Sequence, residues 1–235
     1  MLGHREQLQA SALNWHSLRD RIRDPSLSVL LVLEISIIFL TAPLAAKGLP
    51  LAEIVVDVLT WTVVAVIVVL SDRPAAIVPL LLAVGLISAD FWSSAAWLPV
   101  SPRVLSYIGS ILGFSALTWV VVHAVFAPGR ITAQRVQGAA VVYLNLAMIF
   151  ASAYRLIAEL NPAAFNNASA PDRSTELGTM LYFSLVTLTT TGYGDVTPVD
   201  PFARGLANLE AVIGQFYLAI TIARLVTLEI ADRRR

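Results

Sequence analysis

The sequence has no cysteine and little charge, and both shortages narrow the class of protein. Without cysteine, disulfide bonds, thiolate metal sites and thiol redox switches are excluded. Charged residues make up 14% of the 235 residues, and 16 basic side chains balance 16 acidic ones, which argues against a nucleic-acid-binding protein. The chain also lacks a His-rich metal set, a nucleophile elbow and a phosphate-binding loop, so we do not expect an enzyme.

Hydrophobic residues are abundant instead, at 57% of the chain. A soluble domain of this length cannot cover so much apolar surface, so the composition predicts an all-α integral membrane protein. Six apolar stretches have about the 20 residues that a helix needs to cross the hydrocarbon core. The expected transmembrane helices are 27–46, 51–71, 75–97, 104–127, 136–158 and 202–228.

A shorter apolar segment lies between the fifth and sixth predicted helices. A helix over 175–187 is too short to cross a bilayer, so we expect it to enter the membrane and return. It is followed at 189–195 by Thr-Thr-Thr-Gly-Tyr-Gly-Asp. The two glycines allow left-handed and extended conformations to alternate, which turns successive carbonyls toward one axis and the side chains away from it. The alternative is that this stretch is only a tight turn between two hydrophobic segments.

The stretch from Leu188 to Asp195 closely resembles the signature sequence of potassium channels, with Thr191 where Val or Ile is usual. The resemblance is to the voltage-gated-like superfamily with six transmembrane helices and one pore loop, of prokaryotic type. It implies a homotetramer around a central pore, with a re-entrant pore helix at 175–187 and a selectivity filter at 189–195. The implied ion ligands are filter oxygens of Thr190, Thr191, Gly192, Tyr193 and Gly194. K⁺ is then the permeant ion and the only metal, and no organic cofactor is expected.

The resemblance also assigns residues that support the filter. Tyr182 and Phe183 occupy two positions that are often Trp-Trp in the family. The Tyr182 hydroxyl is expected to reach Asp195, whereas Phe183 offers no donor to Tyr193. Val186 stands where some relatives carry Glu, so Asp195 lacks a carboxyl partner there. These departures, together with the extra hydroxyl of Thr191, leave open the degree of K⁺ over Na⁺ preference.

In the last predicted helix, Gly214 lies at the spacing of the family's inner-helix hinge glycine. Two interpretations stay open, a hinge and a close helix contact that needs a small residue. Glu210, one turn earlier, is expected to be a packed residue behind the filter, held by a hydrogen bond. By helical phase, the expected cavity and gate residues are Gln215, Leu218, Ile222 and Val226, with an apolar constriction at Val226 or Ile230.

The pattern divides the chain into three parts. Residues 1–26 are expected to form a cytoplasmic or interfacial amphipathic segment, 27–127 a four-helix transmembrane domain and 128–235 the pore domain. The four-helix domain resembles a voltage sensor without its arginine ladder, so we expect at most weak voltage dependence. It contains a predicted polar cluster, interpreted either as a cation or proton sensor or as a structural group. The members of this cluster are Glu53, Asp57, Asp90 and Arg103.

An even number of crossings puts both termini on one side of the membrane. Arginines are more frequent on that side, so the termini are expected to be cytoplasmic, in a bacterial inner membrane. The predicted function is a K⁺-selective channel that is not strongly voltage-gated. The alternatives are a weakly selective cation channel and a non-conducting regulatory membrane protein. The expected partners are three further copies of the chain, K⁺, membrane lipid and an unidentified gating ligand or protein.

Overall fold

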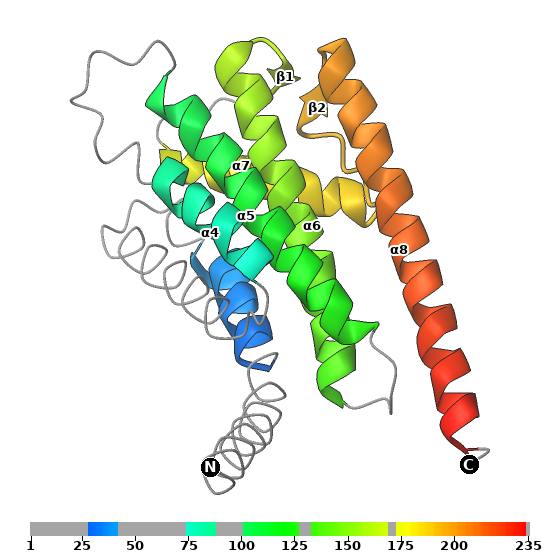
Figure 1. Ribbon diagram of the computed structural model, residues 1–235. Helices are drawn as coiled ribbons and strands as arrows, with labels where there is room; N and C mark the ends of the chain where they lie inside the picture. The colour runs from blue at the N-terminus through cyan, green and yellow to red at the C-terminus, as the bar shows by residue number, and fades with distance from the viewer. Residues whose placement is uncertain (1–27, 42–73, 88–100, 127–132, 169–172, 234–235) are drawn as a thin grey trace, which may run out of the picture.

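The computed structural model describes residues 28–41, 74–87, 101–126, 133–168 and 173–233. The described part is mostly helical (Figure 1). Its elements are η1 (Ser36–Thr41), α4 (Pro74–Ile87), α5 (Pro102–Val125), α6 (Ala133–Leu160), β1 (Phe165–Asn166), α7 (Arg173–Leu188), β2 (Thr197–Pro198) and α8 (Pro201–Arg233). The predicted segment 1–26 and the predicted helix 51–71 lie outside these residues.

Three helices within the described residues are long and apolar enough to cross a membrane: Pro102–His123, Ala133–Leu160 and Pro201–Thr227. The 33 residues of α8 span about 50 Å, well beyond the ~30 Å of a hydrocarbon core. A shorter apolar helix covers Ser28–Leu40 and becomes π-helical at η1. The described part therefore has the helices of a membrane protein, while the six crossings expected from the sequence extend into residues outside it.

Helix α7 differs from the long helices in length and direction. Its 16 residues span about 24 Å, too short for a crossing. Figure 1 shows α7 lying across the direction of α5, α6 and α8, with its C-terminal end against α8. The chain then returns through 189–196 to β2, which pairs antiparallel with β1 at the same end of the molecule as the start of α8. The path of the chain is that of a short helix followed by a return, and its entry into a membrane stays a prediction.

The packing of α4 against α5 depends on one small residue. A Cβ atom on Gly109 of α5 would lie 2.7 Å from the Leu86 Cβ and 2.9 Å from the Ala83 carbonyl oxygen of α4. Both distances are shorter than a carbon atom tolerates, so a larger residue would push the two helices apart.

Two buried clusters join α7 to the long helices. One contains Phe150 and Tyr154 of α6, Phe183 of α7 and Ala203 of α8. The other places Leu181 and Leu188 of α7 against Ala147, Met148 and Ala151 of α6. Apolar packing against α6 and α8 thus fixes the position of α7, including its C-terminal end.

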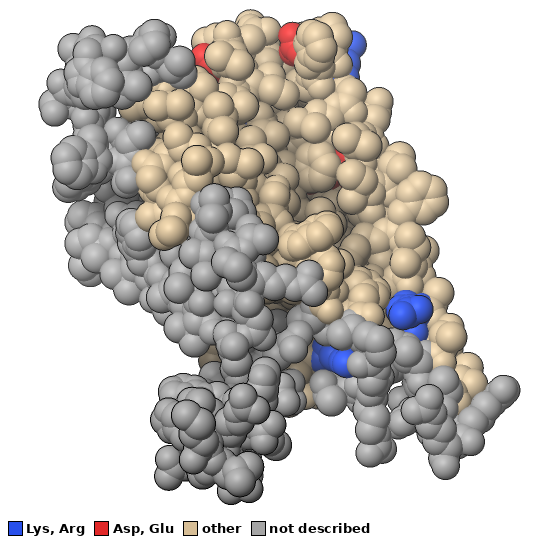
Figure 2. All heavy atoms as spheres, in the orientation of Figure 1, with Lys and Arg blue, Asp and Glu red and all other residues tan. Residues whose placement is uncertain are grey.

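Helix α8 is the least covered of the long helices. Only 17% of its most apolar stretch is buried within the chain, against 56% for α6. Its exposed apolar side chains include Phe202, Leu209, Val212, Phe216 and Ile220. On the face seen in Figure 2, charged atoms gather mainly toward the two ends of the described part, and the middle is nearly uncharged. Both features fit a helix that meets lipid or other apolar protein surface.

Candidate functional site

The backbone after α7 alternates between two conformations. Thr190, Gly192 and Gly194 have positive φ angles of 56°, 59° and 77°, whereas Thr191 and Tyr193 between them do not. Glycine adopts this left-handed region readily, but a β-branched threonine does so at a cost of about 1–3 kcal/mol. The alternation at Gly192 and Gly194 is the one that the glycine spacing predicts, whereas the left-handed Thr190 was not predicted. Strain at Thr190 indicates that the surrounding structure holds this residue in place.

The end of α7 anchors the candidate filter through its backbone. The N–H groups of Thr191 and Gly192 both donate to the Val186 carbonyl oxygen, at 2.9 and 3.3 Å, and the Thr190 N–H donates to the Thr187 carbonyl at 2.9 Å. Carbonyls in the last turn of a helix lack intrahelical donors, so these contacts satisfy them. Val186 was expected to matter through its side chain, whereas the observed contact is made by its carbonyl oxygen, which no side-chain pattern signals.

Two side-chain contacts reach the N-terminal end of the candidate filter. The Gln215 amide of α8 donates to the Thr190 hydroxyl at 3.3 Å. The Thr191 and Thr189 hydroxyls share a hydrogen bond of 2.9 Å. Gln215 of α8 therefore contacts Thr190, the threonine whose hydroxyl is implied by the resemblance to be an ion ligand.

At the C-terminal end of the candidate filter, Tyr182 and Asp195 are connected as expected. The Tyr182 hydroxyl donates to Asp195 Oδ2 at 2.8 Å, and the Tyr182 ring stacks on Tyr193 with 6.4 Å between ring centroids. The Val196 N–H donates to Asp195 Oδ1 at 3.0 Å. The hydrogen bond from Tyr182 is the main cause that lowers the pKa of Asp195. A carboxylate and two aromatic rings thus lie together at the C-terminal end of the stretch.

Phe183 behaves differently from Tyr182, its neighbour. Its ring is buried and packs edge-on against Tyr154 and Phe165, with centroid separations of 4.9 and 5.6 Å. It has no polar atom to donate toward Tyr193, as the sequence indicates. Phe183 therefore supports α7 by apolar packing alone.

Gly214 is a close-contact position in this structure. A Cβ atom there would overlap the Leu188 carbonyl oxygen and lie 2.9 Å from Leu188 Cδ1. The same carbonyl accepts a hydrogen bond from the Tyr143 hydroxyl at 3.2 Å. Helix α8 is continuous across Gly214. The geometry favours the close-contact interpretation for this conformation and leaves bending at this residue as a proposal.

Glu210 lies one turn before Gly214 on α8. Like Gly214 it faces α7, and it is fully buried. Its carboxyl accepts from the Tyr154 hydroxyl of α6 at 2.5 Å and makes a short contact with the Ser184 hydroxyl of α7. The expectation of a packed residue held by a hydrogen bond is confirmed, and the structure adds a second contact. Glu210 therefore joins three helices behind the candidate filter.

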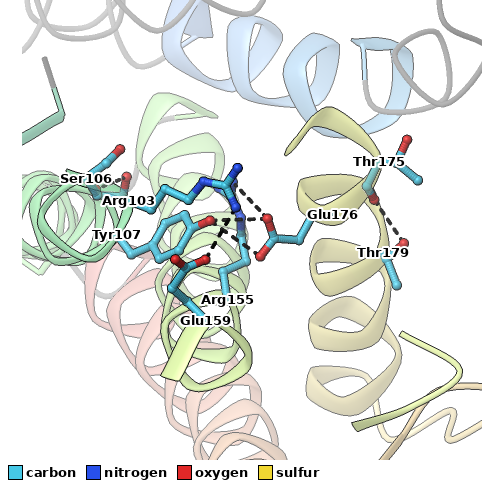
Figure 3. Close-up of polar contacts among 9 residues, drawn as sticks. Arg103, Ser106, Tyr107, Arg155, Glu159, Thr175, Glu176 and Thr179 are labelled. Atoms are coloured by element: carbon cyan, nitrogen blue, oxygen red, sulfur yellow. Dashed lines mark hydrogen bonds and ion pairs between the residues drawn. The ribbon is translucent and has the colours of Figure 1, made fainter. Parts of the chain in front are cut away.

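A second polar cluster, which the sequence analysis did not identify, connects α5 and α6 to the start of α7 (Figure 3). Arg155 of α6 lies 3.9 Å from Glu176 of α7, and the Tyr107 hydroxyl of α5 donates to the same carboxylate at 3.2 Å. The guanidinium also lies 4.5 Å from the Tyr107 ring centroid, a cation–π distance. A buried arginine inside an apolar helix is the signal that could have identified this cluster.

The polar cluster predicted in the four-helix domain can be compared with the structure at one member only, Arg103. Arg103 forms an ion pair of 3.6 Å with Glu159 of α6, and Ser101 contacts the same carboxylate at 3.5 Å. Glu53, Asp57 and Asp90 lie outside the described residues. Within the described part, Arg103 is therefore connected to the C-terminal end of α6.

The residues expected to line the cavity lie on the open side of α8. Leu218, Ile222 and Val226 are all exposed in the single chain. A hollow of about 210 Å³ lies beside the candidate filter, lined by Tyr182, Gly194 and Ala207 among others.

Comparisons with known proteins agree with this geometry. Residues 140–230 match a family model described as "Ion channel", and this range contains most of α6 and all of α7, the 189–195 stretch and nearly all of α8. Protein LctB of Bacillus caldotenax is 36% identical over 87 residues, which cover 36% of this chain and 64% of that protein. The potassium voltage-gated channel protein shk-1 of Caenorhabditis elegans is 32% identical over 80 residues, covering 34% of this chain and 15% of that protein. The chain spans less than two thirds of the length of either relative, and no solved structure matches.

Proposed function

The matches to an ion-channel family and the apolar helices support an ion channel of the membrane as the coarse function, and we propose that the channel is selective for K⁺ and conducts it passively. The observation that carries the proposal is the alternating backbone of Thr190, Gly192 and Gly194 in a potassium-channel-like sequence, held at the C-terminal end of the short helix α7. Alternation of this kind directs successive carbonyls to one side, where they replace the water shell of a cation. The filter oxygens of Thr190 through Gly194 are the proposed ligands.

The pore itself is proposed to form between four identical chains. One chain supplies one filter strand, and irregular backbone at membrane depth must line a wet path or be buried in protein. The open apolar side of α8 supports this assembly, because a helix that contacts the candidate filter is the least covered by its own chain. Gln215, Leu218, Ile222 and Val226 would then face the cavity and its gate.

Topology and gating belong to the same proposal. The pore domain is assigned to residues 128–235, with 27–127 as a four-helix domain, both termini cytoplasmic and the filter opening outward in a bacterial inner membrane. The helix of α5 carries Arg103 at its first turn and no regular arginine spacing within Pro102–Val125, which supports weak voltage dependence. The gating signal is assigned to the membrane helices, a ligand or a partner protein.

A weakly selective cation channel is the second candidate. It is favoured by the apolar environment of Phe183, which leaves the back of Tyr193 without a donor from that position. A less firmly held filter tolerates ions of other sizes, so Na⁺ permeation would rise relative to K⁺.

The test is ion flux into liposomes that contain the purified chain, with K⁺ or Na⁺ as the only cation. We expect K⁺ flux that Ba²⁺ blocks and that the Gly192→Asp variant loses, because a side chain at a left-handed position disrupts the filter. Comparable Na⁺ flux would favour the second candidate. An assembled protein that passes neither ion under varied pH and voltage would overturn both and favour a non-conducting relative.

A further inference from the structure

Three oxygen–oxygen contacts meet at Glu210 and Ser184. The Tyr154 hydroxyl lies 2.5 Å from Glu210 Oε2, and the Ser184 hydroxyl contacts Glu210 Oε1. The same Ser184 oxygen also lies 2.9 Å from the Ala147 carbonyl oxygen of α6. All the side chains involved are essentially inaccessible to solvent. Each contact is short enough to require a hydrogen atom between its two oxygens.

Counting hydrogens identifies the protonation state of Glu210. Tyr154 and Ser184 carry one hydroxyl hydrogen each, and a carbonyl oxygen carries none. Two hydroxyl hydrogens fill two of the three contacts with linear hydrogen bonds, so a linear hydrogen bond in the third takes its hydrogen from the carboxyl group. The consistent arrangement has Tyr154 donating to Glu210, Glu210 donating to Ser184, and Ser184 donating to the Ala147 carbonyl.

We propose that Glu210 is a protonated carboxylic acid that positions the C-terminal half of α7, and that removal of its proton loosens this support. With an ionised Glu210, Ser184 would turn its only hydrogen toward the carboxylate. The Ser184 and Ala147 oxygens would then face each other at 2.9 Å with no hydrogen between them, and a charge would be buried as well.

The surroundings of Glu210 fit a neutral acid. Among the described residues, no lysine or arginine lies within ion-pair distance of its carboxyl group. The titratable groups that face it are the hydroxyls of Tyr154 and Tyr143, both from α6, and α7 contributes the non-titrating Ser184. Neither tyrosine supplies positive charge to stabilise a carboxylate.

The position of this acid connects it to the filter. Glu210 and Gly214 are one turn apart on α8, and their contacts Ser184 and Leu188 are one turn apart on α7. The two contacts therefore form one continuous seam that ends at the first residue before the 189–195 stretch. This consequence for ion flow depends on the proposed function, whereas the protonation state does not.

Infrared difference spectroscopy of the full-length protein in lipid tests the protonation state directly. The wild-type minus Glu210→Gln spectrum at neutral pH should contain the carbonyl band of a protonated carboxylic acid, and this band should shift in deuterated water. A glutamine amide copies the acid, because its NH₂ donates and its carbonyl accepts. Glu210→Gln should therefore keep the wild-type melting temperature, and Glu210→Ala should lower it. A difference spectrum with only carboxylate bands, or a Glu210→Gln variant as unstable as Glu210→Ala, would overturn the proposal.

A flux measurement then tests the connection to the filter. Raising the pH should reduce K⁺ flux through the wild type reversibly, because the proton leaves to water and the seam loses one hydrogen bond. Flux through Glu210→Gln should be within about twofold of the wild-type value at neutral pH and should not fall as pH rises. Equal pH sensitivity of both proteins would refute the positioning role. If the wild type conducts no ion at all, the proposed channel function fails while the infrared result still decides the protonation state.

Discussion

Replacing Gly214 with alanine separates two explanations of this glycine. The added methyl group would overlap the Leu188 carbonyl oxygen and approach Leu188 Cδ1 to 2.9 Å. Leu188 is fully buried and its carbonyl is held by Tyr143, so it has little room to move. Relief requires α8 and α7 to separate by about 1 Å, and overpacking of this kind costs about 1–3 kcal/mol.

Helix propensity acts in the opposite direction. Alanine is more favourable than glycine inside a helix by about 1 kcal/mol. The overpacking penalty exceeds this gain over most of its range, so we expect Gly214→Ala to destabilise the protein by up to about 2 kcal/mol. The strain would fall at the last residue of α7, so K⁺ flux should decrease together with stability.

The assay is thermal denaturation of the purified protein, followed by loss of the assembled peak in size-exclusion chromatography. Gly205→Ala is the matched control, because it lies on the same helix and a Cβ there meets nothing within 4 Å. Gly205→Ala should melt at or above the wild-type temperature, and Gly214→Ala below it. If both variants melt at the same temperature and only Gly214→Ala changes how the channel opens, Gly214 acts as a hinge. The close contact with Leu188 would then not be the reason for glycine at this position.

Two other contacts give separate predictions. Tyr182→Phe removes the hydroxyl that chiefly lowers the pKa of Asp195, so that pKa should rise toward its ordinary value. In the wild type, the stabilisation from this hydrogen bond is fully present at a pH above the ordinary pKa of a carboxyl group. It is lost as the pH falls through the lowered pKa of Asp195. External acid should therefore inhibit the variant at a higher pH than the wild type, as measured by flux at stepped external pH, and an unchanged profile would contradict the role of Tyr182. Glu176→Gln should lower stability by about 1–3 kcal/mol, since it leaves the buried Arg155 without its ion pair, and Tyr107→Phe by less, since it removes one hydrogen bond. Equal melting temperatures for both variants and the wild type would show that the cluster does not stabilise α7.

Local sequence patterns were sufficient for the elements that depend on neighbours along the chain. The glycine spacing at 192 and 194 predicted the alternating backbone, and the length of the apolar run before it predicted a helix too short to cross. The contact between Tyr182 of α7 and Asp195 was also predictable, because the family resemblance places these two residues next to each other. These features are determined by residue type and short spacing.

Contacts between distant helices were less accessible from the sequence. Glu210 could be expected to be packed, but its partners Tyr154 and Ser184 depend on how three helices cross. The Arg155, Glu176 and Tyr107 cluster joins residues up to 69 positions apart. For Gly214, a hinge and a close contact have the same sequence signal. Only the position of the Leu188 carbonyl distinguishes them.

The central claim is that the 189–195 stretch selects K⁺, and the reversal potential tests it most directly. The protein is placed in a planar bilayer with K⁺ on one side and Na⁺ on the other, and the voltage of zero current is recorded. The account predicts a large reversal potential with the sign of K⁺ diffusion, abolished with the current in the Gly192→Asp variant. A reversal potential near zero, with a current that still requires Gly192, would contradict K⁺ selectivity and leave a cation channel that does not distinguish the two ions.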